Sequence, residues 1–144
     1  MPRRRCSCRR SFRNRTRILV DQYAQYEPVE GHRINGELTL GENIADVSGL
    51  AVAYRAYLLS LDGQEPPVID GLSGAQRFFV GFAHVWRAKT RPEEAVRRIT
   101  IDPHSPPEFR VFGTLVNTDA FFEAFGVESG DGMWRAPDER VRIW

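Results

Sequence analysis

The chain has 144 residues and an apolar content of 42%, the size and composition of one ordinary globular domain. No run of about 18 apolar residues occurs, and no apolar segment follows the basic N-terminus, so we expect neither a transmembrane helix nor a signal peptide in this chain; the compartment stays unknown. The formal net charge of +1 hides an asymmetry: residues 1–17 carry eight arginines and no acid, which leaves 12 Lys+Arg against 19 Asp+Glu, a net charge of −7, for the rest.

The arginine-rich segment 1–11 admits three interpretations. A basic arm can bind nucleic acid or a membrane surface. However, only Phe12 interleaves the arginines and no recognisable binding fold follows them, so we expect no nucleic-acid partner. We favour the third interpretation, that the segment is disordered or is not native coding sequence because of a misassigned start or a shifted reading frame. The two cysteines, Cys6 and Cys8, are too few for a zinc site, which usually takes four ligands.

The first half of the chain predicts two helices joined by a loop. Apolar residues at helical spacing favour an amphipathic helix over 12–26. Segment 27–37, EPVEGHRINGE, predicts a loop or a hairpin turn around Asn35-Gly36. A long helix is predicted over 40–61, where apolar residues recur at spacings of three and four, and DGQEPP at 62–67 ends it.

Two further helices are predicted in the middle of the chain. Ser73 and Gln76 have the spacing of a capping box, which starts the first of them. The second starts at Arg91-Pro92, because a proline and two glutamates are favoured in the first turn of a helix. This helix should end before Ile101.

The C-terminal part predicts mostly irregular structure. The three prolines of 101–109 indicate an irregular loop, and RVFGTLVN at 110–117 indicates a short β-like segment. Asn117 or Thr118 then caps a short helix, DAFFEAF, which Gly126 ends before an irregular tail. The predicted fold is therefore mainly α, with short β-like segments and irregular loops.

Two carboxylates mark the start of the long helix. Glu42 and Asp46 are four residues apart and share one helix face. Taken alone, they favour a solvated acidic helix start, which the helix dipole stabilises. A metal-bound glutamate, with an aspartate that accepts a hydrogen bond from the far nitrogen of a histidine ligand, also fits this spacing.

A second group of polar residues lies in the proline-rich loop. His104 is flanked by two prolines, and Asp102 could orient and charge its ring. A lone histidine in a loop is more often only a surface residue. With Arg110 nearby, however, an imidazolium and a guanidinium are the groups needed to stabilise an oxyanion and to hold a peptide carbonyl.

These motifs carry a resemblance to a known family. GENIADVSGLAVAYRAY resembles the E-N-x-A-D helix of the neprilysin and endothelin-converting-enzyme family of zinc metallopeptidases. The stretch from FFVGFAHVW to DAFFEAF resembles the C-terminal region of that family, and Arg142-Ile143-Trp144 resembles its Arg-Val-Trp terminus. The matches run in order from about Phe12 to Trp144. The resemblance implies the C-terminal part of a thermolysin-like (zincin) catalytic domain over 12–144.

The resemblance also implies roles for single residues. Glu42 would be a ligand of the catalytic zinc, and Asp46 would support a zinc-bound histidine. His104, oriented by Asp102, would stabilise the tetrahedral transition state, and Arg110 would contact the substrate backbone. Three residues would help to form the wall of the S1′ pocket, although helical periodicity alone favours plain core packing for them: Phe82, Val85 and Trp86.

One required motif is missing from the sequence. A zinc peptidase of this class uses H-E-x-x-H, and none of the three histidines, His32, His84 and His104, lies in such a motif. We therefore expect the zinc-binding helix and the other ligands upstream of residue 1. We also expect the isolated chain to be truncated and inactive, with the upstream part of the catalytic domain as its possible partner and a peptide as substrate.

Two other functions stay open. The chain could be a non-catalytic pseudo-enzyme or interaction module of the same family, or a binder of nucleic acid or membrane through its arginine arm. If partner helices are missing, apolar surface should be exposed, and the candidates are Phe78, Phe79 and the face from Leu50 to Tyr57.

Overall fold

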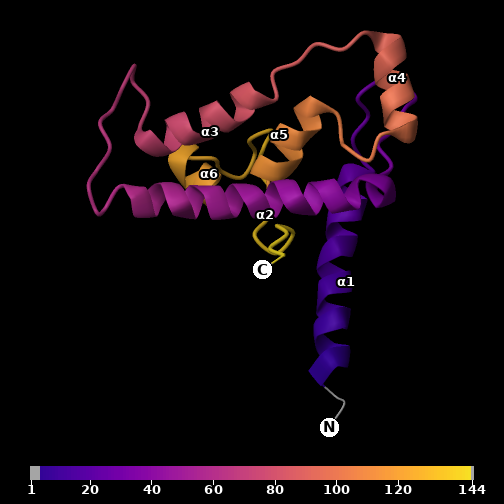
Figure 1. Ribbon diagram of the computed structural model, residues 1–144, viewed down its shortest axis with the longest axis horizontal. Helices are drawn as coiled ribbons and strands as arrows, with labels where there is room; N and C mark the ends of the chain where they lie inside the picture. The colour runs from indigo at the N-terminus through magenta and orange to yellow at the C-terminus, as the bar shows by residue number, and fades with distance from the viewer. Residues whose placement is uncertain (1–3, 144) are drawn as a thin grey trace.

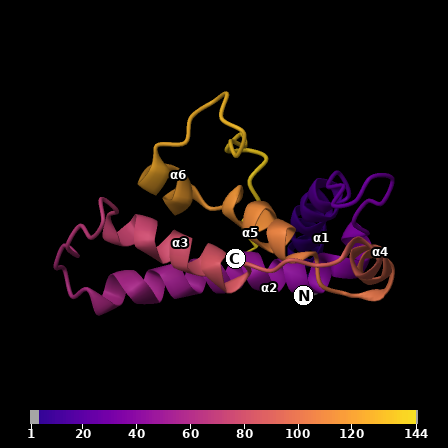
Figure 2. The same cartoon turned by 90° about the horizontal axis from the view of Figure 1, so that it is seen from above.

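The fold is built from helices around one long central helix. The computed structural model describes residues 4–143, and the side chains of residues 10–143. Its helices, within these residues, are α1 (Arg4–Tyr23), α2 (Gly36–Ser60), α3 (Gly74–Val85), α4 (Pro92–Ile101), α5 (Pro107–Leu115) and α6 (Asp119–Phe125). Helix α2 forms the axis of the molecule, α1 crosses it near one end, and α3, α5 and α6 lie along it on one side (Figures 1 and 2). The mainly α prediction is confirmed.

The junction between α1 and α2 differs from the prediction. The Asn35 side chain accepts hydrogen bonds from the backbone of Glu37 and Leu38, both at 3.1 Å, so Asn35 is the N-cap of α2 and not part of a hairpin turn. The turn lies earlier, at Gly31, which has a φ of 74° between the bridged residues Val29 and His32. An asparagine before a glycine suits both a turn and an N-cap, which explains the error.

Helices α3 and α4 begin as predicted. The Ser73 hydroxyl accepts from the backbone of Gln76 at 3.2 Å, and the Gln76 side chain accepts from the backbone of Ser73 at 2.9 Å, so the capping box is confirmed. Helix α4 begins at Pro92 and includes Ile101, one residue beyond the predicted end.

The β-like prediction for 110–117 is wrong. These residues belong mainly to α5, which begins at Pro107 with Glu108 in its first turn and shortens the predicted loop to 102–106. Valine, phenylalanine and threonine favour strands only weakly, and packing on α2 overrides that preference. Thr118 is the N-cap of α6 without a capping side-chain bond, and Gly126, at a φ of 62°, ends that helix as predicted.

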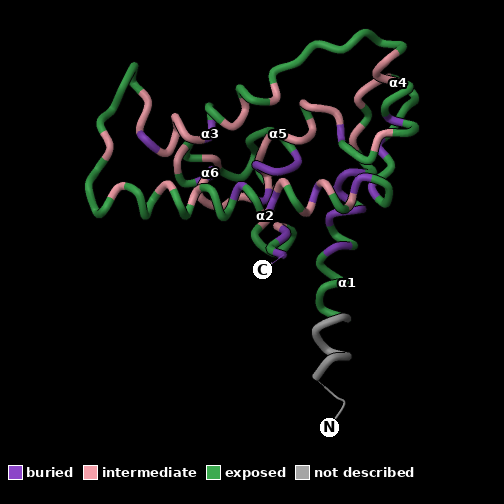
Figure 3. The backbone as a smooth tube through the Cα atoms, viewed as in Figure 1, coloured by how far each residue is buried: buried purple, intermediate pink, exposed green. Residues whose placement is uncertain are grey.

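The core has two apolar clusters, which include Val47 and Leu50 of α2 respectively. Figure 3 shows buried segments in α1, α2 and α5. The first joins α1, α2 and the C-terminal tail through Leu19, Tyr23, Ile34, Val47, Val141 and Ile143. The second joins α2, α3, α5 and α6 through Leu50, Phe79, Leu115, Phe121 and Phe122. Leu50 and Phe79 are therefore buried, contrary to the expectation that both are exposed.

The N-terminal half of α1 projects away from the other helices (Figure 1). Residues 1–3, Trp144 and the side chains of Cys6 and Cys8 lie outside the part of the chain described above, and the origin of segment 1–11 stays a prediction. No helix among the described residues combines the length and the apolar character needed to cross a membrane.

Candidate functional site

The site lies where the N-terminal half of α2 meets the loop 102–106 and helix α5. Glu42 is on α2 and is partly exposed, and its Oε2 lies 3.2 Å from Nε2 of His104 and 3.8 Å from Nη2 of Arg110. Glu42 is more than 60 positions away in sequence from both His104 and Arg110. The structure therefore brings together the carboxylate, the imidazole and the guanidinium that the sequence singled out.

Asp102 fixes His104 within its loop. Its Oδ1 accepts from the backbone N–H of His104 at 2.9 Å and lies 2.8 Å from Nδ1 of the ring. Because these hydrogen bonds favour the carboxylate, they lower the pKa of Asp102. A carboxylate can only accept, so Nδ1 carries a proton and Nε2 is the ring nitrogen directed at Glu42. The predicted pairing of Asp102 with His104 is present.

Asp46 forms a two-pronged ion pair with Arg110. Nε and Nη2 of Arg110 donate to the two carboxylate oxygens, each at 2.7 Å, and the Asp46 side chain is only 9% exposed. The guanidinium also lies over the Trp86 ring, 3.9 Å from its centroid. The hydrogen bonds to Asp46 raise the pKa of Arg110. The arginine is therefore held charged and in one orientation.

This ion pair does not prevent the role predicted for Asp46. Each carboxylate oxygen has two lone pairs, so Asp46 can accept from Arg110 and from a further N–H group at once. Support of a zinc-bound histidine by Asp46 stays a prediction. The sequence did not indicate Arg110 as its partner, because 64 residues separate the two.

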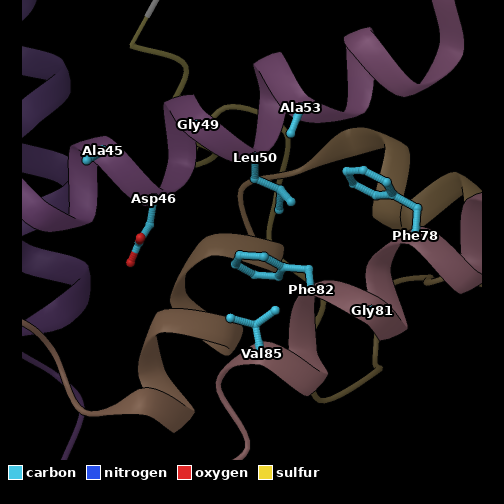
Figure 4. A pocket seen from close by; sticks show the side chains of 9 residues that line it. All are labelled: Ala45, Asp46, Gly49, Leu50, Ala53, Phe78, Gly81, Phe82 and Val85. Atoms are coloured by element: carbon cyan, nitrogen blue, oxygen red, sulfur yellow. The ribbon is translucent and has the colours of Figure 1, made fainter. Parts of the chain in front are cut away.

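An apolar groove runs beside the ion pair, between α2 and α3 (Figure 4). Its volume is about 380 Å³. The lining residues are Ala45, Asp46, Gly49, Leu50, Ala53, Phe78, Gly81, Phe82 and Val85. Two of the three predicted pocket residues, Phe82 and Val85, line this groove, whereas Trp86 instead covers Arg110.

The described residues do not complete a metal site by themselves. Among them, no three His, Cys, Asp or Glu side chains converge as ligands of one ion. A catalytic zinc takes three protein ligands and a water. Glu42 is a candidate for one of those positions, because its carboxylate is partly exposed at the edge of the site. Its role as a zinc ligand stays a prediction.

Sequence reasoning missed two buried residues beside the site. Asn43 follows Glu42 and Ser105 follows His104, and the Ser105 hydroxyl donates to the Asn43 side chain at 2.8 Å. Both side chains are almost fully buried. The available signal was a polar residue directly after each of two candidate site residues, Asn43 after Glu42 and Ser105 after His104.

Comparison with known proteins places these residues in a family context. A family profile described as "Peptidase family M13" matches residues 6–141. Human endothelin-converting enzyme 1 is 42% identical over 137 residues, which are 93% of this chain and 17% of that protein. Human neprilysin is 41% identical over 140 residues, 93% of this chain and 18% of that protein.

Solved structures match closely as well. The zinc metalloprotease ZMP1 of Mycobacterium tuberculosis, in complex with an inhibitor, superimposes with a TM-score of 0.92 at 49% identity, over 94% of this chain and 22% of that one. PepO from Lactobacillus rhamnosis has a TM-score of 0.77 at 36% identity, over 94% of this chain and 20% of that one. This chain thus spans less than a quarter of the length of these proteins.

Proposed function

This chain belongs to peptidase family M13, the family of endothelin-converting enzyme 1 and neprilysin, and from that premise we propose that it forms one side of a zinc metallopeptidase active site. The observation that supports this function best is the convergence of Glu42, His104 and Arg110, with His104 at 3.2 Å and Arg110 at 3.8 Å from the Glu42 carboxylate. In this proposal Glu42 is a zinc ligand, and the zinc, when bound, polarises the scissile carbonyl and activates a water.

The other groups act on the substrate. As an imidazolium, His104 donates from Nδ1 to Asp102 and presents Nε2–H to the site, so the Nε2 proton can stabilise the negative charge that develops on the carbonyl oxygen. Arg110 uses Nε and Nη2 on Asp46, which leaves the N–H groups of Nη1 for a peptide carbonyl. Phe82 and Val85 offer apolar contacts to a substrate side chain in the groove.

The chain by itself lacks part of this chemistry. H-E-x-x-H is absent from the sequence, so the general base and two further zinc ligands have to come from elsewhere. We infer that the isolated chain does not hydrolyse peptides and that an upstream catalytic segment completes the site. The absence of H-E-x-x-H also supports the alternative function, a non-catalytic interaction module of the same family.

A chimera tests the function directly. The chain would replace the matching segment of the Mycobacterium tuberculosis zinc metalloprotease, to which it is 49% identical. We expect stoichiometric zinc and peptide hydrolysis that a chelator abolishes, and we expect Glu42→Gln to reduce both strongly. Glu37→Gln, an exposed carboxylate on the same helix, is the matched control and should change neither.

The outcomes separate the two functions. A chimera that folds but neither binds zinc nor cleaves peptide supports the interaction module. Full activity of the Glu42→Gln chimera contradicts the ligand role. Chelator-sensitive hydrolysis by the isolated chain contradicts the inference that it is inactive.

A further inference from the structure

A line of buried polar side chains runs under the site, from the start of α2 to the loop that carries His104. Thr39 donates from its hydroxyl to the backbone carbonyl of the N-cap residue Asn35 at 3.1 Å. The Asn43 amide donates to the Thr39 hydroxyl at 2.9 Å, and Ser105 donates to the Asn43 carbonyl oxygen at 2.8 Å. The side chains thus form a continuous chain of hydrogen bonds that ends next to His104.

Because these hydrogen bonds are buried, they favour one position of the loop relative to α2. Thr39, Asn43 and Ser105 are 2%, 1% and 3% exposed. A buried amide or hydroxyl that loses its partner costs about 1–3 kcal/mol. Displacement of the loop from α2 would leave both the Ser105 hydroxyl and the Asn43 oxygen unpaired, so one position of the loop is strongly preferred.

The two ends of this bond are adjacent to the groups proposed to act in catalysis. Asn43 directly follows Glu42 on α2, and Ser105 directly follows His104 in the loop. Asp102 sets the ring of His104 relative to its own loop, and its side-chain hydrogen bonds within the described residues stay inside that loop. Arg110 ties α5 to α2 at Asp46, six residues beyond His104. Apart from the partly exposed contact of His104 with Glu42 itself, the buried Ser105–Asn43 bond is the nearer of these ties between the loop and α2.

We propose that Asn43 and Ser105 are positioning residues, which hold His104 against Glu42 by one buried hydrogen bond between the loop 102–106 and α2. The position of His104 relative to Glu42 depends on this chain alone. Its catalytic consequence rests on the proposed function, because only there does the distance between His104 and the zinc ligand matter. Supporting contacts of this kind set such distances to within about 0.5 Å.

The test measures the distance in the isolated, isotope-labelled chain. The readout is the nuclear Overhauser effect between the His104 ring protons and the Glu42 side-chain protons. Nε2 of His104 and Oε2 of Glu42 are 3.2 Å apart. We expect Ser105→Ala and Asn43→Ala each to remove most of this signal. The chemical shift of the His104 amide, which reports its bond to Asp102, should stay unchanged.

Two further variants separate positioning from general loss of stability. Ser73→Ala removes a helix cap far from the site and should lower stability while it leaves the signal intact. Ser105→Thr keeps a hydroxyl and should restore the signal. If Ser105→Ala does not fold, Ser105→Cys keeps a similar volume with a much weaker donor and gives the same readout.

The double variant adds a second criterion. Because both substitutions remove the same bond, the combined Asn43→Ala and Ser105→Ala change should weaken the signal no further than either alone. Wild-type signal in both single variants overturns the proposal. In the chimera we expect Ser105→Ala to lower kcat by up to about 100-fold with little change in KM. An inactive wild-type chimera would contradict the proposed function and leave the distance measurement standing.

Discussion

At the scale of single residues, Arg110 neutralises the nearly buried carboxylate of Asp46. Its two bonds to Asp46, a side chain only 9% exposed, mean that its removal leaves a nearly buried carboxylate without a partner. We expect Arg110→Ala to lower the free energy of unfolding by about 3 kcal/mol. Arg110→Lys should cost less, about 1–2 kcal/mol, because lysine keeps the charge but loses the two-pronged geometry. Urea unfolding followed by circular dichroism measures both.

Arg98→Ala is the control for this pair. Arg98 donates to Glu94 at 2.8 Å on the exposed face of α4. An exposed ion pair contributes at most about 1 kcal/mol, so this variant should stay close to the wild type. Equal losses in Arg110→Ala and Arg98→Ala would mean that burial of the Asp46 pair has no energetic effect.

Tyr23 makes the stability sensitive to alkali. Its ring is fully buried in the first cluster, its hydroxyl makes no hydrogen bond of normal geometry among the described residues, and burial raises its pKa above the ordinary value. The unfolded chain therefore ionises first, near pH 10, so stability falls as pH rises above that value.

Tyr23→Phe should remove the part of this dependence that Tyr23 contributes. At pH 7 we expect a change of about 1 kcal/mol or less, since the hydroxyl makes no hydrogen bond of normal geometry among the described residues. Above about pH 10 the variant should become more stable than the wild type, by up to about 1.4 kcal/mol for each further pH unit. Thermal unfolding at pH 7, 10 and 11 measures the gap. A gap that stays constant across this range would show that Tyr23 ionises equally in both states.

At the scale of helices, the sequence indicated helix starts and ends through local signals. The Ser73 capping box, the proline at the start of α4 and Gly126 at the end of α6 act within one turn, and all three were read correctly. Helix α5 was missed because its β-branched residues favour a strand locally, while its contact with α2 decides the outcome. Pro107 followed by Glu108 was the available sign of a helix start.

Close packing between helices explains one glycine of α2 and not another. A Cβ at Gly36 would lie 2.2 Å from the backbone oxygen of Val20 in α1, whereas a Cβ at Gly41 would meet nothing within 4 Å. We expect Gly36→Ala to destabilise the chain by about 2 kcal/mol or more. Gly41→Ala should stabilise it by about 0.5–1 kcal/mol, because alanine is the better helix former. The denaturant midpoints of the two variants measure these changes. If both variants shifted the midpoint equally in the same direction, the close contact of Gly36 with α1 would be contradicted.

At the scale of the whole molecule, the family motifs led to the site and the packing supplied its partners. Glu42 and Asp46 belong to one short motif, and His104 and Arg110 belong to another. The pairing of Asp46 with Arg110 and of Asn43 with Ser105 joins segments more than 60 residues apart, and no local pattern encodes such contacts. Single-sequence reasoning therefore reached the residues of the site and missed how they hold one another.

The groove beside the site bears on the behaviour that we expect of the whole chain in solution. Its lining is mostly apolar, and Val85 at its edge is 75% exposed. Leu59, on the far half of α2, is exposed to a similar degree, at 73%, but does not line the groove. A continuous apolar surface drives association more strongly than a single apolar side chain surrounded by water.

We therefore expect the isolated chain to self-associate through this groove. Val85→Asp should shift sedimentation equilibrium toward the monomer, because a charge at the groove edge would have to be desolvated on association. Leu59→Asp adds the same charge at an equally exposed position outside the groove and should leave the equilibrium nearly unchanged. If Leu59→Asp dissociates the chain as effectively as Val85→Asp, association depends on net charge rather than on the groove, because both variants change the net charge equally.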